Sequence, residues 1–315
     1  MARRRDTGPD GVAVIDKEAG WTSHDVVAKA RGILQTRKVG HAGTLDPDAT
    51  GVLVLGVGSA TRLLRYCTVL PKSYVAEIVF GVATTTLDAA GEVVAEVDMS
   101  HLTPEAVTAA AQQFLGDIEQ VPPMVSAIRI GGRRLHELAR EGKEVDRAPR
   151  PVTIHRFDVE PLEHEPGAPR PVYRAEVSCS SGTYVRSLAA DLGAALGGVA
   201  HLRALRRTAV GPFTLAEARP LAELDASTLL PPEAAVAGLG RVVVDDELAA
   251  LVRNGRVLPA ARLGASGPPP WAVYDTQGAL LAVYQPHRGD QVKPEMVLAR
   301  PSDGADGQSE RQPRQ

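Results

Sequence analysis

The 315-residue sequence contains only two cysteines, Cys67 and Cys179, which lie 112 positions apart. Neither has a second cysteine or a histidine at the short spacing of a metal site. This scarcity excludes a disulfide-stapled scaffold and gives no indication of a cysteine zinc site. Unpaired cysteines are typical of a reducing compartment, so we expect a cytoplasmic protein.

Long apolar runs are also missing. The longest candidate, Val52–Val57, is interrupted by Gly56 and is far shorter than the ~18–20 residues that a bilayer span needs. The first residues are basic, but Asp6, Gly8 and Pro9 follow instead of an apolar signal core. We therefore expect neither a membrane span nor secretion, and we expect residues 1–10 to be a flexible N-terminus.

The chain lacks the positive charge of a protein that coats nucleic acid indiscriminately, since its formal net charge is −3. The distribution is uneven, however. Residues 129–150 carry seven basic and four acidic side chains. Two interpretations remain open for this segment: a solvated helix with i,i+4 ion pairs, or a track for phosphates.

Strand and helix patterns are intermixed without the regular alternation of a doubly wound sheet, which predicts an α+β fold. Hydrophobic residues at 44% support a globular core. Helices are expected to begin after Thr22, whose capping box includes Asp25, and after Thr103. The expected elements are strands at 12–15, 74–80 and 173–179, helices at 23–34, 104–115 and 185–192, and a loop at 40–51.

A second, β-rich domain is expected near the C-terminus. A helix from Asp246 to Asn254 precedes a hairpin formed by residues 271–274 and 280–284 around Gln277-Gly278. The segment His164–Pro171 is expected to be a surface loop. Residues 301–315 are polar and lack large apolar side chains, so we expect a disordered tail.

Several familiar motifs are only imitated. Asp46–Gly51 begins like a calcium loop, but its twelfth position is Val57 where a bidentate Glu is required. The segment that begins with Gly56 and Gly58 resembles a dinucleotide-binding fingerprint, but the third glycine of that motif is missing. Ser23-His24-Asp25 contains the residue types of a hydrolase triad, but adjacent side chains at a helix start point in different directions.

One set of polar residues remains, distributed over three segments: the loop around His41, Gly43 and Asp46, the strand start Lys72–Tyr74, and the helix start Tyr184–Arg186. Singly, each has an ordinary explanation, because Asp before Pro forms turns and tyrosines commonly lie at core edges. Arg186 is less ordinary, since a cation is unfavourable at a helix N-terminus and suggests a specific acidic partner.

The segment Gly43–Gly51 (GTLDPDATG) resembles the G-x-L-D-P-x-A-T-G signature of the TruB family, the bacterial tRNA pseudouridine synthases that act on uridine 55 of the T-loop. Ordered similarity continues over Val14–Phe213. The further matching segments are Lys72–Tyr74, Phe80-Gly81 with Asp88 and Gly91, Pro122–Ala127, Gly132–Leu135, Cys179–Arg186, Leu205–Thr208 and Gly211–Phe213.

The resemblance implies a pseudouridine synthase catalytic domain over residues 11–240, with a mixed, largely antiparallel sheet flanked by helices. It also implies a small PUA-like RNA-binding domain over residues 241–300. Within the first domain, residues 128–150 would form an RNA-binding flap that settles when RNA binds.

The resemblance also implies roles for individual residues. Asp46 would be the essential catalytic carboxylate, with Arg186 as its partner and Tyr74 stacked on a flipped base. Whether Asp46 attacks C1′, adds at C6 or removes the C2′ proton stays open. An adjacent Arg186 is expected to lower the pKa of Asp46. Substrate binding is implied for Lys17, His41, Gly43, Tyr184, Leu205 and Arg133.

The implied reaction is redox-neutral and transfers no phosphate, so neither a cofactor nor a metal is expected. The implied partner is the T-arm of tRNA, bound by a monomer without a guide RNA, a protein partner or a membrane. Two alternatives remain: a guide-RNA-dependent relative that shares the L-D-P core, and a tRNA-folding chaperone whose catalytic site is incidental.

Overall fold

A computed structural model of the chain describes residues 8–126, 128–130, 132–135, 138, 141, 143, 145–163 and 170–298. The expected tail (301–315), residues 1–7 of the expected N-terminus and most of the expected loop at His164–Pro171 lie outside the described residues. The described part divides between Leu230 and Pro231 into two compact units.

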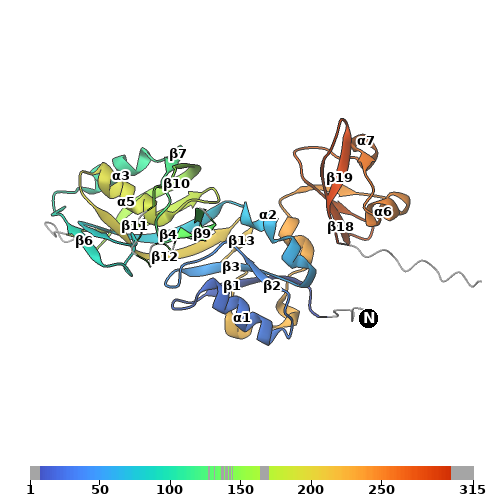
Figure 1. The fold of residues 1–315 in the computed structure, drawn as a ribbon, viewed down its shortest axis with the longest axis horizontal. Coiled ribbons are helices and arrows are strands. Elements are labelled where there is room, and N and C mark those ends of the chain that lie inside the picture. Colours follow the sequence, from blue (N-terminus) through green and yellow to red (C-terminus); the bar gives the residue numbers. More distant parts are fainter. Residues whose placement is uncertain are drawn as a thin grey trace, which may run out of the picture. The chain divides into compact units, whose positions relative to one another are not determined.

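A mixed, mainly antiparallel sheet of ten strands forms the centre of the first unit (Figure 1). The strand order is β14-β1-β3-β12-β4-β11-β10-β7, with β13 paired to β12 and β2 to β3. Only β1–β14 and β3–β12 are parallel pairs in this sheet. The strands are β1 (Gly11–Lys17), β2 (Val39–Ala42), β3 (Thr50–Val57), β4 (Lys72–Phe80), β7 (Gly116–Gln120), β10 (Arg150–Glu163), β11 (Val172–Cys179), β12 (Ala200–Val210), β13 (Phe213–Thr214) and β14 (Arg219–Pro220).

Two hydrophobic cores share this sheet. Helices α3 (Pro104–Gln112) and α5 (Val185–Ala195) pack on the part formed by β4, β10 and β11, whereas α1 (Ser23–Ile33) packs on β1 and β3. Leu205 on β12 contacts both cores. Because β12 lies between β3 and β4, it brings side chains from both halves of the sheet to one place.

Shorter elements complete the first unit. The helix α2 (Leu64–Thr68) precedes β4, and the hairpins β5 (Val82–Thr84) with β6 (Val93–Glu96) and β8 (Arg129–Ile130) with β9 (Arg133–Arg134) lie outside the main sheet. None of the described helices has the length and apolarity that a membrane span requires.

The second unit has its own core around a five-stranded sheet of order β15-β17-β18-β19-β16. Its elements are β15 (Gly240–Val243), α6 (Asp246–Arg253), β16 (Leu258–Pro259), α7 (Ala260–Leu263), β17 (Trp271–Tyr274), β18 (Leu280–Pro286) and β19 (Gln291–Val297). The expected boundary after residue 240 would divide β15, which pairs in register with β17. The compact units instead divide ten residues earlier.

The expected α+β class and β-rich second unit are confirmed, and so is the capping box of Thr22 and Asp25 on α1. Two local expectations were wrong. Residues 40–42, expected to be part of a loop, belong to strand β2, because they pair with β3. Helix α3 ends at Gln112 instead of continuing to Leu115.

Candidate active site

The loop between β2 and β3 carries Asp46 and is fixed by buried side chains. Lys17 Nζ donates to Pro47 O at 2.8 Å, and Arg207 Nη2 donates to Gly43 O at 3.1 Å. Ser23 Oγ donates to Leu45 O and accepts from Leu45 N–H at 2.9 Å. These contacts tether the backbone on both sides of Asp46, which restricts where its carboxylate can lie.

Asp46 forms an ion pair with Arg186, with Nη2 at 3.1 Å from Oδ2. The Arg186 side chain is only 6% exposed and also donates to Val125 O at 2.9 Å and to Thr86 O at 3.1 Å. Asp88 provides a second carboxylate, 3.4 Å from Nη1. The acidic partner expected from the position of Arg186 in the first turn of α5 is therefore present twice.

The pKa of Asp46 is raised above its ordinary value, which differs from the expected lowering. Burial is the largest cause, and the nearby Asp88 adds to it, whereas the Arg186 guanidinium acts in the opposite direction. The Asp46 side chain is 45% exposed, yet the surrounding protein removes enough water to raise the pKa of its carboxylate. Desolvation outweighs the ion pair in this setting.

Tyr74 lies on β4 with its side chain buried, directly opposite Arg207 of β12 in the antiparallel register. Burial raises the pKa of the Tyr74 phenol, while the charge of Arg207 and its hydrogen bond to the hydroxyl oppose this change. Lys72, two residues earlier on the same face of β4, donates to Thr68 O and Leu70 O, and burial lowers its pKa to about 8.

A pocket of about 460 Å³ joins these groups. It brings together six of the nine residues expected from the sequence: Gly43, Asp46, Tyr74, Tyr184, Arg186 and Leu205. A neighbouring hollow of about 380 Å³ shares Asp46, Arg186 and Leu205 with it. Tyr184 is held by Gln120, which accepts from its backbone N–H at 2.7 Å and donates to its carbonyl.

Lys17 does not have the geometry expected of an RNA contact. Its side chain is 1% exposed, and Nζ donates to the carbonyls of Glu18, Trp21 and Pro47 at 2.7–2.9 Å. Burial lowers the pKa of Lys17 to about 8. An ammonium that already donates three hydrogen bonds to backbone carbonyls has no proton left for a phosphate.

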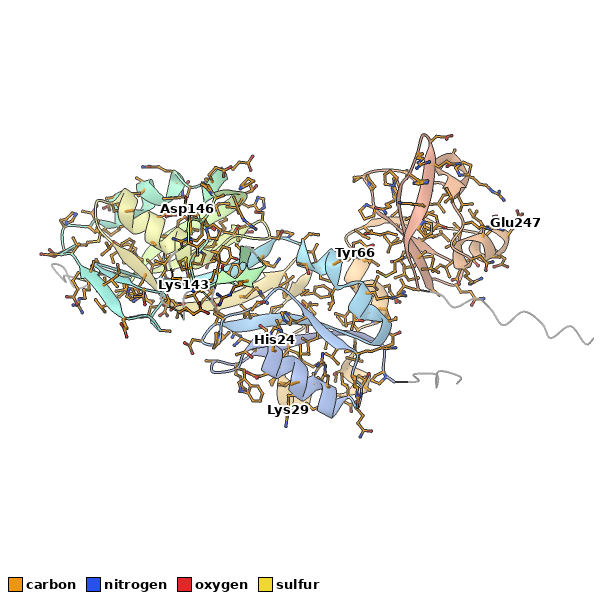
Figure 2. All side chains as sticks on the ribbon, in the orientation of Figure 1. His24, Lys29, Tyr66, Lys143, Asp146 and Glu247 are labelled. Carbon is orange, nitrogen blue, oxygen red and sulfur yellow. The ribbon has the colours of Figure 1, made fainter. Side chains whose placement is uncertain are left out.

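His41 and Arg133 lie outside the pocket lining. His41, on β2, is edge-on to His24 of α1, which is labelled in Figure 2, with ring centroids 5.3 Å apart. His41 Nδ1 is buried and has no hydrogen-bond partner among the described residues. Arg133, on β9, pairs with Glu141, and its side chain is 46% exposed.

Sequence reasoning assigned no role to Lys72, Asp88 or Arg207. Strand alternation offered a signal for two of them, because Lys72 shares a face with Tyr74, and Arg207 shares one with Leu205. Asp88 lies in a loop after β5, where no periodicity applies.

The described residues contain no group of three or more metal-binding side chains arranged to hold an ion.

Two family models match the chain. The N-terminal domain of TruB family pseudouridylate synthase matches residues 31–185, and the C-terminal domain of tRNA pseudouridylate synthase B matches residues 186–247. Similar curated proteins include tRNA pseudouridine synthase B of Symbiobacterium thermophilum, 55% identical over 80% of this chain and 84% of that protein.

The Streptomyces coelicolor protein of the same name is 48% identical over 90% of this chain and 95% of its own. Among solved structures, a chain of a Cbf5-Nop10-Gar1 complex is similar with a TM-score of 0.69 and 27% identity, covering 92% of this chain and 85% of that one.

Proposed function

This chain belongs to the TruB family of pseudouridylate synthases, and we propose that it isomerises uridine 55 in the T-loop of tRNA to pseudouridine. The observation that carries the proposal is the convergence of Asp46, Arg186 and Tyr74 in one pocket, each from a segment that matches the family motifs. The reaction breaks the N1–C1′ bond, turns the uracil and rejoins it through C5.

Asp46 is the catalytic carboxylate in this proposal. It acts in the ionised form, by attack on C1′, by addition at C6 or by removal of the C2′ proton. Arg186 fixes the rotamer of Asp46 and favours its charge, and Asp88 with the Thr86 and Val125 carbonyls holds the guanidinium in turn. Because the ion pair is already in place, its charged groups need not reorient during the reaction.

The flipped uracil occupies the pocket, stacked on Tyr74 with Leu205 as its apolar wall. Stacking of a base on an aromatic ring contributes ~1–3 kcal/mol, comparable to the few kcal/mol needed to extrude a base. Gly43 has φ of +81°, and a side chain there would come within 3.3 Å of Lys72 Cε. Glycine therefore keeps this wall of the pocket open, and Tyr184 forms another part of the pocket lining.

The tRNA contacts extend beyond the pocket. His41, whose side chain is partly exposed, fills the T-loop gap that the flipped base leaves. Arg133 and the basic flap, residues 128–150, meet the RNA backbone. The second compact unit, which begins at Pro231, is the PUA-like domain and adds a second RNA surface. Lys17 acts indirectly, because it anchors the Asp46 loop through Pro47.

We further propose a cytoplasmic monomer that needs neither a guide RNA nor a protein partner. The support is comparative. The curated relatives named tRNA pseudouridine synthase B are 45–55% identical, whereas the chain from the three-protein complex is 27% identical.

Tritium release from tRNA labelled at C5 of uridine tests the proposal, because C5 loses its hydrogen when it bonds to C1′. We expect release by the wild type with EDTA present and a loss of at least ~10³-fold in Asp46→Asn. The target uridine replaced by cytidine is the control RNA. No release by the wild type would overturn the isomerase function, and tRNA annealing activity retained by Asp46→Asn would favour the chaperone alternative.

A further inference from the structure

A second buried arginine forms part of the pocket wall, and the proposed function gives it no role. Arg207 is 1% exposed and lies on β12, with Tyr74 of β4 on one side and Gly51 of β3 on the other in the sheet register. It lines the pocket together with Tyr74 and Asp46. A full positive charge therefore stands in the pocket wall, away from water.

The partners of Arg207 are neutral groups. Nε donates to Val52 O at 2.7 Å, Nη2 to Gly43 O at 3.1 Å and Nη1 to Thr44 O at 3.4 Å, and Tyr74 faces Arg207 from β4 and interacts with its charge. Among the residues that the structure describes, no carboxylate forms an ion pair with Arg207.

The other two arginines of this region differ in that respect. Arg186 has Asp46 and Asp88, and Arg206, next to Arg207 in the chain, has Asp16 at 2.7 Å. A buried charge without a counter-ion is costly, and burial lowers the pKa of Arg207 accordingly. The pocket thus contains a cation without a counter-ion. An anion that forms beside this cation during the reaction is strongly stabilised.

The proposed isomerisation forms such an anion. When the N1–C1′ bond breaks, its electron pair leaves with the base and spreads over N1 and the uracil oxygens. C5 then uses an electron pair to bond to C1′, the C5 proton leaves to solvent, and N1 gains a proton, so the atoms of the nucleotide are conserved. A fixed positive charge in a water-poor site stabilises the developing negative charge strongly.

We propose that Arg207 is a positioning residue that orients the Tyr74 hydroxyl toward the departing uracil and places its own positive charge behind it. This inference rests on the proposed function. It assigns Arg207 to the bond-breaking step, whereas a purely structural role would confine it to tethering the Gly43–Thr44 backbone.

The leaving group distinguishes the two roles. Single-turnover cleavage of the N1–C1′ bond is measured with tRNA carrying uridine or 5-fluorouridine at the target, because fluorine stabilises the departing base as an anion. Arg207→Met removes the charge, Arg207→Lys keeps it, and Arg206→Met is the matched control on the same strand. Circular dichroism and the tRNA Kd are measured for each variant.

We expect Arg207→Met to reduce the rate ~10²–10³-fold with uridine. With 5-fluorouridine the reduction should be smaller by a factor of at least ten. Arg207→Lys should recover most of the rate, and Arg206→Met should stay within about twofold of the wild type. Equal losses on both RNAs in a folded Arg207→Met protein would overturn the inference. Failure of the proposed function is distinguishable, since the wild type would then convert neither RNA.

A measurement without substitution at Arg207 covers the case in which Arg207→Met does not fold. Binding of uracil and of 5-nitrouracil, whose N–H is more acidic, is titrated against pH in Asp46→Asn, which lacks the competing carboxylate. We expect the 5-nitrouracil anion to bind at least tenfold more tightly than neutral uracil. Equal or weaker binding of the anion would overturn the inference.

Discussion

At the residue scale, Asp46 has a carboxylate whose charge is favoured by one neighbour and opposed by another. Burial and Asp88 raise its pKa, and Arg186 lowers it. Because Asp46 acts when ionised, its active fraction falls as the pH falls through this raised pKa. The acidic limb of the rate profile should therefore have its midpoint above 3.8, the ordinary value of an aspartate.

Single-turnover rates at saturating enzyme, measured against pH, check this prediction. Arg186→Gln should move the limb to higher pH, because the favourable charge is lost, and Asp88→Asn should move it to lower pH, because the like charge is lost. A limb at the same pH in all three proteins would show that another group controls the rate.

The sequence predicted which residues lie together better than it predicted their surroundings. Asp46, Tyr74 and Arg186 come from distant segments, yet motif similarity placed all three in one pocket. The direction of the Asp46 pKa was not predictable, because it depends on how much water the fold removes. The burial of Lys17 was not predictable for a similar reason, since a lysine is ordinarily exposed and only the fold shows the three carbonyls around it.

At the element scale, the Asp46 loop depends on the anchor that Lys17 provides. Lys17→Met leaves three carbonyls without their donor, each costing ~1–3 kcal/mol when buried, partly offset by relief from a buried charge. We expect a net loss of about 2 kcal/mol in the free energy of unfolding and a slower single-turnover rate, measured by urea titration and tritium release.

Lys29→Met is the matched control, because Lys29 is an exposed lysine on α1, labelled in Figure 2. It should leave the free energy of unfolding within ~0.5 kcal/mol. If Lys17→Met instead weakened tRNA binding with unchanged stability, Lys17 would contact RNA after all and the anchoring role would be wrong.

The junction of β3 and β12 depends on a glycine. Gly51 has φ of +97°, and a Cβ there would lie 2.1 Å from Arg207 O. Gly51→Ala must therefore separate the strands that bring Arg207 to the pocket, and we expect a loss of more than ~3 kcal/mol together with most activity.

Gly116→Ala separates backbone strain from steric conflict, because Gly116 also has a positive φ, +87°, but has nothing within 4 Å of the added Cβ. It should cost only ~1 kcal/mol in thermal or urea unfolding. If both substitutions lowered the free energy of unfolding by similar amounts, the strands around residue 51 would relax readily to relieve the contact between the added Cβ and Arg207 O.

Regular patterns predicted the elements well and the irregular connections poorly. Strand β4, strand β11 and helix α1 follow from alternation and capping in the sequence. Strand β2 did not, because Gly40 within it and Gly43 directly after it are turn signals, and only pairing with β3 makes its residues extended. The end of α3 at Gln112 was missed because the apolar Phe114 and Leu115 continue the pattern of the helix beyond its last turn.

At the scale of the whole molecule, two units with separate cores share one chain, and all pocket-lining residues come from the first. The sequence predicted the second unit from its hairpin and placed its start at residue 241, whereas the compact units divide between Leu230 and Pro231. The stretch before residue 240 has no strong pattern, and β15 is recognisable only through its parallel partner β17.

This division predicts that damage to the second core affects RNA binding rather than catalysis. Tyr284 is 0% exposed, and its hydroxyl donates to Arg256 O at 2.8 Å. Tyr284→Ala removes a large buried ring and should destabilise this unit by ~3–5 kcal/mol. We expect weaker tRNA binding, with the single-turnover rate at saturating enzyme within about threefold of the wild type.

Val243→Ala, at a position that is 55% exposed in the same unit, controls for substitution as such and should change neither quantity. In calorimetry of Tyr284→Ala, the second unit should unfold at a lower temperature, while the unfolding transition of the first unit stays unchanged. The reason is that each core is stabilised by its own contacts. A large fall in the saturated rate, with the first transition intact, would mean that the second unit acts on the chemistry and not only on the affinity for RNA.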